Sequence, residues 1–112
     1  MRLFIRCVEG EVRLGPGKIQ LLELIGTHGS ISEAARAMNM SYRRAWLLVD
    51  ELNHSFRAPV TTARTGGKGG GHAALTEFGR ELIGLYRRIE TDAAAAAAGS
   101  MRKLEAHIAD RA

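Results

Sequence analysis

The sequence predicts a mainly α-helical fold with a small β-hairpin, followed by a long final helix. Three observations predict it. Two capped helical patterns between residues 30 and 56 are separated by a very short turn. A β-branched run then leads into a glycine-rich segment, and apolar residues recur at helical spacing from residue 78 onwards. A 112-residue chain of this kind is expected to form a single structural unit.

The composition is that of a globular chain, with 46% hydrophobic and 25% charged residues. The net charge of +4 is compatible with a polyanionic partner but does not require one. The single cysteine, Cys7, excludes an intrachain disulfide, and its apolar surroundings predict a buried thiol. No apolar run reaches the roughly 20 residues that cross a bilayer, and Arg6 interrupts the N-terminal apolar stretch. We therefore expect a cytoplasmic protein without a membrane partner.

The N-terminal third combines extended and helical patterns. Residues 2–8 alternate between two sets of side chains, which predicts a strand, and residues 12–14 can pair back onto it as a hairpin. Apolar residues at Ile19, Leu22 and Ile25 then predict a helix over about 17–27. Gly29 is expected to end this helix.

Two helices joined by a tight turn are predicted next. Ser30 and Glu33 have the spacing of a capping box, so a short helix is expected over 31–38. Asn39 lies where the chain must turn sharply, and Asn tolerates the left-handed conformation at a helix end. Ser41 then caps a second helix over about 42–56.

The second helix has two chemically different faces. Its buried stripe is predicted to consist of apolar residues spaced three and four apart, namely Ala45, Leu48, Val49, Leu52 and Phe56. Arg43 and Arg44 lie in its first turn, where free backbone N–H groups and the helix dipole favour phosphate. Guanidinium groups also bind phosphate oxygens and guanine edges, so this helix is predicted to read DNA.

The glycine-rich segment is predicted to be the tip of a hairpin between Arg64 and Leu75. A nucleotide-binding alternative is weak, because Lys68 is followed by Gly69 rather than by the Ser or Thr of a P-loop. The G-x-G-x-x-A string ending at Ala74 is not followed by the pattern of a parallel βαβ unit. The four histidines are scattered, without the paired spacing of metal ligands. We expect neither an enzyme nor a catalytic site, metal site or cofactor in this chain.

The last helix is predicted to begin after Thr76 and to reach nearly to Asp110. Little domain remains to cover an apolar stripe of this length, which favours pairing with the same helix of a second copy. The alternative is that the helix folds back on its own domain. The residues expected to form the dimer contact are Phe78, Leu82, Leu85, Ile89, Met101 and Leu104.

The order of strand, three helices, hairpin and long helix is that of a winged helix-turn-helix. This domain is expected over residues 1–76, and the dimerisation helix over 77–112 belongs to the same unit. The chain resembles the N-terminal DNA-binding domain of the ModE-type molybdate-dependent transcriptional regulators, a LysR-like winged helix-turn-helix. The resemblance rests on LGPGKIQLLELI at 14–25, GSISEAARAMNMSYRRAWLLVDELN at 29–53 and TGGKGGGHAALTEFG at 65–79.

The resemblance implies a homodimer that binds a palindromic operator on double-stranded DNA and regulates molybdenum uptake or cofactor genes, with a repressor-like action. The DNA contacts that it implies come from Ser41, Tyr42, Arg43, Arg44, Arg64, Thr65 and Lys68. We expect Ser32, Trp46 and Leu47 to contact DNA as well. Full-length members carry a C-terminal molybdate-binding region that has no counterpart up to Ala112. No molybdate site is expected here, so the signal comes from a separate effector-binding protein or is absent.

Two alternatives to a DNA-binding regulator remain open. Asp50 and Glu51 beside the DNA-reading face allow a protein-interaction module that keeps the winged fold without reading DNA. The glycine-rich segment allows an enzyme that binds a nucleotide. Steep salt dependence of DNA affinity would argue against the first alternative, and absence of a thermal shift with nucleotides against the second.

Overall fold

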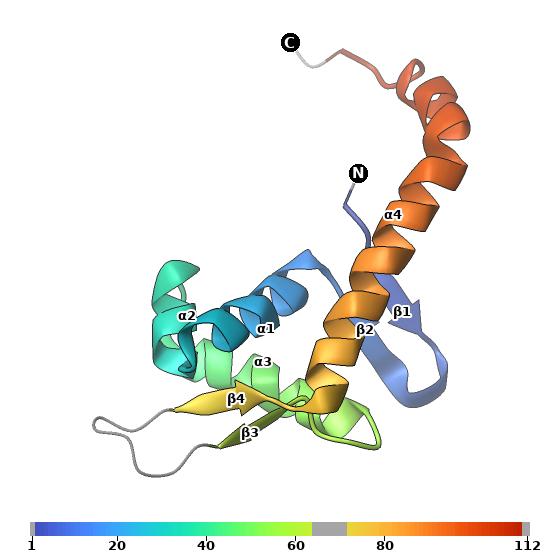
Figure 1. Ribbon diagram of the computed structural model, residues 1–112. Coiled ribbons are helices and arrows are strands. Elements are labelled where there is room, and N and C mark those ends of the chain that lie inside the picture. Colours follow the sequence, from blue (N-terminus) through green and yellow to red (C-terminus); the bar gives the residue numbers. More distant parts are fainter. Residues whose placement is uncertain (1, 64–71, 111–112) are drawn as a thin grey trace.

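The computed structural model describes residues 2–63 and 72–110 (Figure 1). Three helices, α1, α2 and α3, are bracketed by two separate two-stranded sheets, and the long helix α4 rises away from them. The element bounds are β1 Ile5–Cys7, β2 Val12–Leu14, α1 Pro16–His28, α2 Ile31–Ala37, α3 Tyr42–Ser55, β3 Thr61–Ala63, β4 Ala73–Leu75 and α4 Glu77–Glu105. This order confirms the predicted winged helix-turn-helix architecture.

The N-terminal strands form the expected antiparallel hairpin. Arg6 lies opposite Arg13, and a 3₁₀ turn over Glu9–Glu11 joins the strands. Val12 and Leu14 face the core, whereas Cys7 is exposed, so the prediction of a buried thiol was wrong. The reason is that β1 is only three residues long and lies at the edge of the molecule, where Ile5 is its most covered residue.

The core is divided between two clusters on either side of α1. Ile19 and Leu22 pack with β2, Val60 and α4, whereas Leu21 and Ile25 pack with α2 and α3. Alanine side chains at 34, 35 and 45 are almost fully buried where α2 meets α3, and their small volume allows the helices to approach closely. α1 therefore fixes the position of both the helix-turn-helix and the long helix.

The start of α4 is fixed to the segment before β3. Thr76 accepts a hydrogen bond from the Gly79 backbone N–H as the helix cap, and its own hydroxyl donates to the Pro59 carbonyl at 2.6 Å. Gly79 lies directly on the Val60 carbonyl, where a Cβ atom would be 2.1 Å from the oxygen. This contact turns one particular face of α4 toward the domain.

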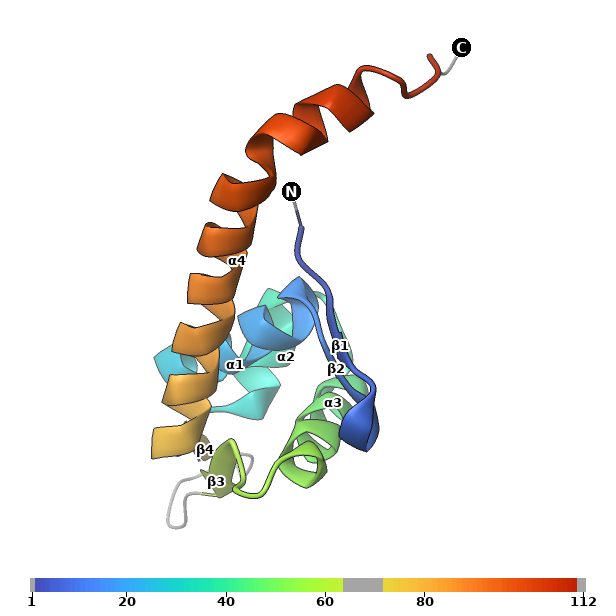
Figure 2. The same ribbon diagram turned by 90° about the vertical axis from the view of Figure 1, so that its right-hand side faces the viewer.

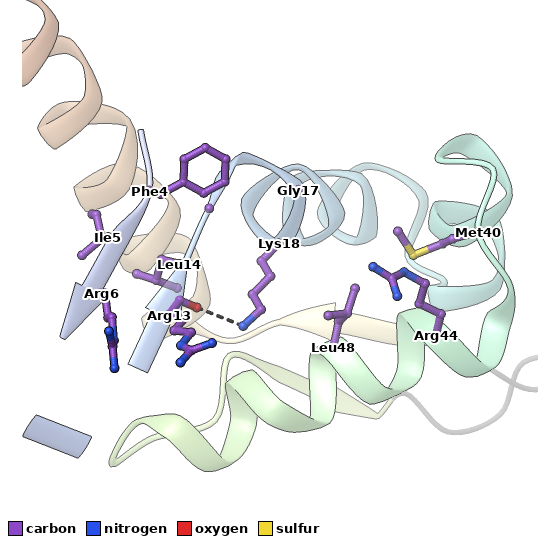
Figure 3. A pocket seen from close by; sticks show the side chains of 11 residues that line it. Phe4, Ile5, Arg6, Arg13, Leu14, Gly17, Lys18, Met40, Arg44 and Leu48 are labelled. Atoms are coloured by element: carbon purple, nitrogen blue, oxygen red, sulfur yellow. Dashed lines mark hydrogen bonds between the residues drawn. The ribbon is translucent and has the colours of Figure 1, made fainter. Parts of the chain in front are cut away.

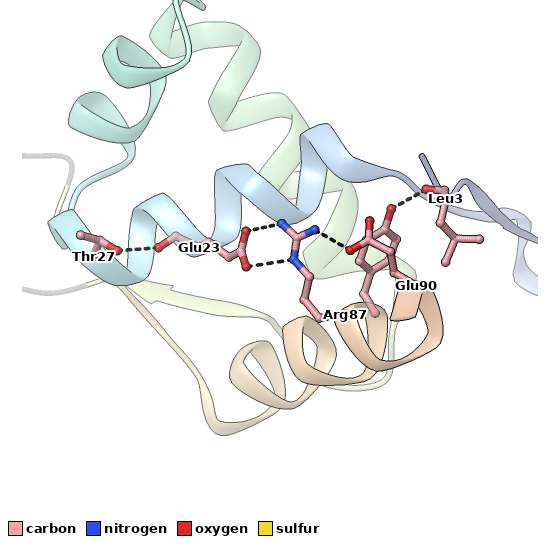
Figure 4. Close-up of polar contacts among 6 residues, drawn as sticks. Leu3, Glu23, Thr27, Arg87 and Glu90 are labelled. Atoms are coloured by element: carbon pink, nitrogen blue, oxygen red, sulfur yellow. Dashed lines mark hydrogen bonds and ion pairs between the residues drawn. The ribbon is translucent and has the colours of Figure 1, made fainter. Parts of the chain in front are cut away.

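Polar contacts hold α4 against the rest of the protomer (Figure 4). Arg87 forms a bidentate ion pair with Glu23 of α1 at 2.7 and 3.1 Å and also bonds Glu90 at 2.9 Å. These carboxylates raise the pKa of the Arg87 guanidinium further above its usual value. The hydroxyl of Tyr86, whose pKa is raised by burial, donates to the Leu3 carbonyl. α4 is thus joined to both α1 and the N-terminal segment.

The packing of α4 covers some residues of the predicted dimer stripe and leaves others exposed. Leu82 is buried in the protomer's core and Phe78 packs against that core beside Phe56, so the protomer itself already covers both side chains, and their part in a dimer contact stays a prediction. Leu85 and Ile89 remain 49% and 45% exposed. Gly79, Leu82 and Tyr86 define the buried face, and Leu85 lies off it by about a quarter turn because successive helical residues are rotated by about 100°.

Beyond this region α4 leaves the domain and bends in its C-terminal part (Figure 2). Leu104 near the end of α4 and Ile108 beyond it are exposed, and Met101 is half-buried. The molecule is consequently elongated, with principal extents of 55 × 35 × 22 Å. None of the helices in the described residues combines the length and apolar character that crossing a membrane requires.

Candidate nucleic-acid interface

The helix-turn-helix is held by local contacts that match the sequence pattern. The Ser30 hydroxyl accepts a hydrogen bond from the Glu33 backbone N–H at 3.2 Å, and Ser41 accepts one from Arg44 at 3.1 Å. Asn39 has the left-handed φ of 56° that the tight turn requires. The Met40 N–H donates to the Ala35 carbonyl at 3.0 Å and closes the end of α2. The N-terminus of α3 is therefore presented at a fixed angle to α2.

The outer face of α3 is unusually apolar for a surface helix. Tyr42, Trp46 and Leu47 are 47%, 46% and 50% exposed, although Ala45, Val49 and Leu52 on the opposite side are buried. Arg43 and Arg44 are exposed in the same first turn. The arrangement offers large apolar side chains for contact with base edges and thymine methyl groups, with cations beside them for phosphate.

None of the exposed cations of this face is neutralised within the part of the chain that the structure describes. Neither Arg43 nor Arg44 forms a salt bridge there, whereas Lys18, Arg87 and Arg88 do. The free backbone N–H groups at the start of α3 add a partial positive charge at the same place. The first turn of α3 is thus a site of unpaired positive charge.

The strands β3 and β4 lie beside one flank of α3. A groove of ≈ 380 Å³ separates Tyr42, Trp46 and Asp50 from the two strands, with Thr62 and His72 on the strand side. The pairing of β3 with β4, and of Ser30 with His72, directs the hairpin along this flank (Figure 1). A ligand on the outer face of α3 would therefore meet the base of the hairpin as well.

Asn53 joins α3 to the hairpin, a role that the sequence analysis missed. Its Oδ1 atom accepts hydrogen bonds from the backbone N–H groups of Val60 and Thr61 at 2.7 and 3.2 Å, and its Nδ2 donates to the Thr61 hydroxyl at 3.2 Å. The available signal was an amide side chain that directly follows the buried Leu52. Asn53 therefore sets where the hairpin begins relative to the DNA-reading helix.

The structure brings most predicted contact residues to one side of the molecule. Ser41, Tyr42, Arg43, Arg44, Trp46 and Leu47 all lie exposed on α3 or at its cap, and Ser32 is exposed in the first turn of α2. Arg64, Thr65 and Lys68, predicted at the hairpin tip, lie outside the described residues. Across residues 2–63 and 72–110, no three His, Cys, Asp or Glu side chains gather where they could hold a metal ion.

Comparison with known proteins identifies the same region. Residues 17–80 match the family described as bacterial regulatory helix-turn-helix proteins of the lysR family. The chain is 45% identical over 95 residues to the molybdenum-pterin-binding protein MopB of Rhodobacter capsulatus, which covers 80% of this chain and 35% of that protein. It is 37% identical over 79 residues to the molybdenum transport protein ModE of Azotobacter vinelandii, covering 70% and 29%.

A third relative is named as a DNA-binding transcriptional regulator. The chain is 44% identical over 71 residues to the DNA-binding transcriptional dual regulator ModE of Escherichia coli strain K12, which covers 63% of this chain and 27% of that protein. The chain thus spans about a third of the length of the relatives that it matches. The matched family model includes α1, α2, α3 and both strands of the hairpin, and it extends over more than half of the sequence. The chain therefore belongs to the lysR family of bacterial regulatory helix-turn-helix proteins.

Proposed function

We propose that this chain is the DNA-binding part of a dimeric, repressor-like transcriptional regulator of molybdenum-related genes, and that it has no enzymatic activity. The observation that carries the proposal is the outer face of α3. There, Arg43 and Arg44, which form no salt bridge within the described residues, stand beside exposed Tyr42, Trp46 and Leu47 on a capped helix N-terminus. An apolar and cationic face of this kind is costly to leave in water and fits a DNA major groove.

In this proposal α3 enters the major groove with its first turn, and the hairpin contacts the neighbouring backbone. The groove between α3 and the strands supports this, because it places both elements on one side of the molecule. We expect the glycine-rich segment with Arg64, Thr65 and Lys68 to add contacts to the DNA backbone.

Fluorescence anisotropy of duplex DNA at several salt concentrations tests this role for α3. The double variant Arg43→Gln/Arg44→Gln should reduce the negative slope of log affinity against log salt by about 2, roughly one per lost phosphate contact. If either side chain reads a base, the difference in binding free energy between the preferred base pair and a wrong one should also fall by about 1–3 kcal/mol per contact.

A matched control removes the same charge elsewhere. Arg102 and Lys103 lie exposed near the end of α4, far from α3 (Figure 2). Arg102→Gln/Lys103→Gln should leave the sequence preference unchanged and alter affinity only through net charge. Equal behaviour of the two double variants would contradict the role of α3, and salt-independent binding would favour the protein-interaction alternative.

The dimer is proposed through α4. Leu85 and Ile89 are half-exposed on a helix that projects beyond its own domain, and an apolar helix face of this kind is commonly covered by a second helix. Sedimentation of Leu85→Glu/Ile89→Glu should show a monomer under conditions in which the parent chain is a dimer. Glu81→Gln on the same helix is the control and should remain dimeric. A parent chain that sediments as a monomer at all accessible concentrations would refute this part of the proposal.

The link to molybdenum rests on two relatives, which are named a molybdenum-pterin-binding protein and a molybdenum transport protein. Transcript levels should be compared in cells with and without this gene, each grown at low and at high molybdate. Repression predicts that transcripts of molybdate-responsive genes rise when the gene is deleted. A set of altered transcripts with no response to molybdate would refute the link.

A further inference from the structure

A second groove, on the flank of α3 away from β3 and β4, has no role in the proposal above. It has a volume of ≈ 450 Å³ and lies between the N-terminal hairpin, the start of α1 and the first half of α3. In Figure 3 the hairpin residues Phe4 and Arg13 stand on one side and Met40 and Arg44 on the other, with Leu48 between them. The volume lies within the range of small-molecule sites, roughly 300–1,000 Å³.

The rim of this groove carries unpaired positive charge. Arg6 and Arg13 occupy directly opposite positions of the β1–β2 pair, and Arg44 approaches from α3. None of the three forms a salt bridge within the described residues. Like charges in opposite positions of a strand pair repel each other. Glu11 and Glu51 line a neighbouring hollow with both arginines and offset part of this repulsion, and a bound anion would offset more of it.

Lys18 is the one cation of the groove that is already engaged. Its ammonium group donates to the Arg13 carbonyl at 2.9 Å and to Glu51 at 3.0 Å, which joins α1 to both β2 and α3. These contacts link the two walls of the groove and leave Arg6, Arg13 and Arg44 without a salt bridge in the described residues.

The walls between the cations are apolar. Phe4 is 70% exposed, and its ring lies against the backbone of Gly15, where a Cβ atom would be 3.0 Å away. Met40 and Leu48 are half-buried on the opposite wall, although neither belongs to the fully buried core. The Arg2 guanidinium lies over this ring, 6.0 Å from its centroid. An exposed ring with guanidinium groups around it offers contact to an apolar body with an acidic group attached.

We propose that this groove binds an amphipathic organic anion, a small molecule with an apolar or aromatic body and a carboxylate, sulfonate or phosphate group. The apolar body lies between Phe4 and Leu48, and the acidic group accepts hydrogen bonds from Arg6, Arg13 or Arg44. Charge complementarity favours this occupant over a neutral molecule, and the apolar walls favour it over an inorganic anion.

Such a ligand would act on DNA binding through Arg44, which borders the groove and also lies in the first turn of α3. An acid group bound to Arg44 would neutralise a cation that the α3 face offers to DNA, so the ligand and DNA would weaken each other's binding. This consequence rests on the proposed function, whereas the ligand site itself does not.

The fluorescent probe 8-anilinonaphthalene-1-sulfonate tests the site without DNA, and the neutral N-phenyl-1-naphthylamine is its matched counterpart. The sulfonate probe should bind with enhanced fluorescence, and Arg6→Gln/Arg13→Gln should weaken this binding about tenfold, as loss of charged hydrogen bonds predicts. Binding of the neutral probe should be unchanged in that variant. Arg102→Gln/Lys103→Gln should leave both probes unaffected.

The apolar wall is tested by Phe4→Ala, with Val8→Ala as its control. Both side chains are largely exposed, so neither change should unfold the protein, but only Phe4 lines this groove. Phe4→Ala should weaken both probes, and backbone amide shifts caused by the sulfonate probe should cluster at residues 4–6, 13–18 and 40–48. Amide shifts confined to α4, or equal affinity of the parent and the Arg6/Arg13 variant for the sulfonate probe, would overturn the proposal.

The coupling is tested by titrating the sulfonate probe into a preformed complex with labelled duplex DNA. DNA affinity should fall as the groove fills, and the Arg6/Arg13 variant should need about tenfold more probe for the same loss. DNA binding that the probe leaves unchanged would refute the coupling while leaving the site intact. Absence of DNA binding before any probe is added would refute the proposed function instead.

Discussion

Gly79 is the position at which the packing of α4 can be tested most severely. Its missing side chain lets the helix backbone lie directly on the Val60 carbonyl, and a Cβ atom there would be 2.1 Å from the oxygen. The neighbour is backbone rather than a flexible side chain. Val60 is fully buried, and the Val60 carbonyl also accepts a hydrogen bond from the Thr76 N–H at 3.0 Å. The Gly79→Ala variant can be accommodated only if α4 moves away from the core.

The expected cost follows from two opposing terms. Overpacking a close contact costs about 1–3 kcal/mol, and the upper part of this range applies because the backbone must move. Alanine recovers about 0.5–1 kcal/mol of helix propensity relative to glycine. Gly79→Ala should therefore destabilise the protein by about 2 kcal/mol, which corresponds to a fall of roughly 8 °C in Tm for a domain of this size.

Gly84 provides the matched control on the same helix. A Cβ atom at Gly84 would have no neighbour within 4 Å, so Gly84→Ala gains helix propensity without a clash. Thermal unfolding followed by circular dichroism should show the Tm of Gly84→Ala rising by a few degrees while that of Gly79→Ala falls. Equal Tm changes in the two variants would refute the close contact between α4 and Val60.

Three further changes test other parts of the fold by chemical unfolding. Asn53→Ala should cost about 2 kcal/mol, because two backbone N–H groups lose their acceptor; an unchanged midpoint would contradict this. Asn39→Ala should cost about 1 kcal/mol and Asn39→Gly close to nothing, since φ is 56°; equal costs would dismiss the left-handed turn. Arg87→Met should lower the free energy of unfolding by less than about 1 kcal/mol, because the ion pairs of Arg87 are partly solvated. A larger loss would show that these ion pairs contribute more to stability than solvated pairs do.

Features set by neighbouring residues were predictable from the sequence. The caps Ser30, Ser41 and Thr76 each accept the expected hydrogen bond from a backbone N–H three residues later. Asn39 adopts the left-handed conformation that its position in the turn predicted. These features depend on one turn of chain at a time, so the residue types within that turn determine them.

Features set by distant contacts were not predictable in the same way. The apolar spacing of α4 correctly predicted a helix but could not tell which residues face the protomer. Leu82 is buried and Leu85 exposed because Gly79 meets Val60 and Tyr86 reaches Leu3, contacts that join separate parts of the chain. The exposure of Cys7 likewise depends on distant parts of the chain, because among the described residues only β2 pairs with β1.

The candidate site also combines features that local sequence predicted with features that depend on distant contacts. The exposed face of α3 followed from its helical spacing, whereas the hydrogen bonds from Asn53 to Val60 and Thr61 required knowledge of where the chain returns. The groove formed by Phe4, Arg13 and Arg44 also combines residues that are remote in sequence. A pattern within one segment of the sequence does not indicate how close these residues lie in the folded protein.

Selection of bound sequences from a random pool of duplex DNA tests the central claim most directly. A dimer that reads DNA with the outer face of α3 predicts a palindromic consensus. Its half-sites should lie about 34–36 Å apart, or a multiple of this distance. Enrichment should disappear for Arg43→Gln/Arg44→Gln and persist for Arg102→Gln/Lys103→Gln. A pool that remains random with the parent chain, or a consensus that survives loss of both α3 arginines, would contradict the account.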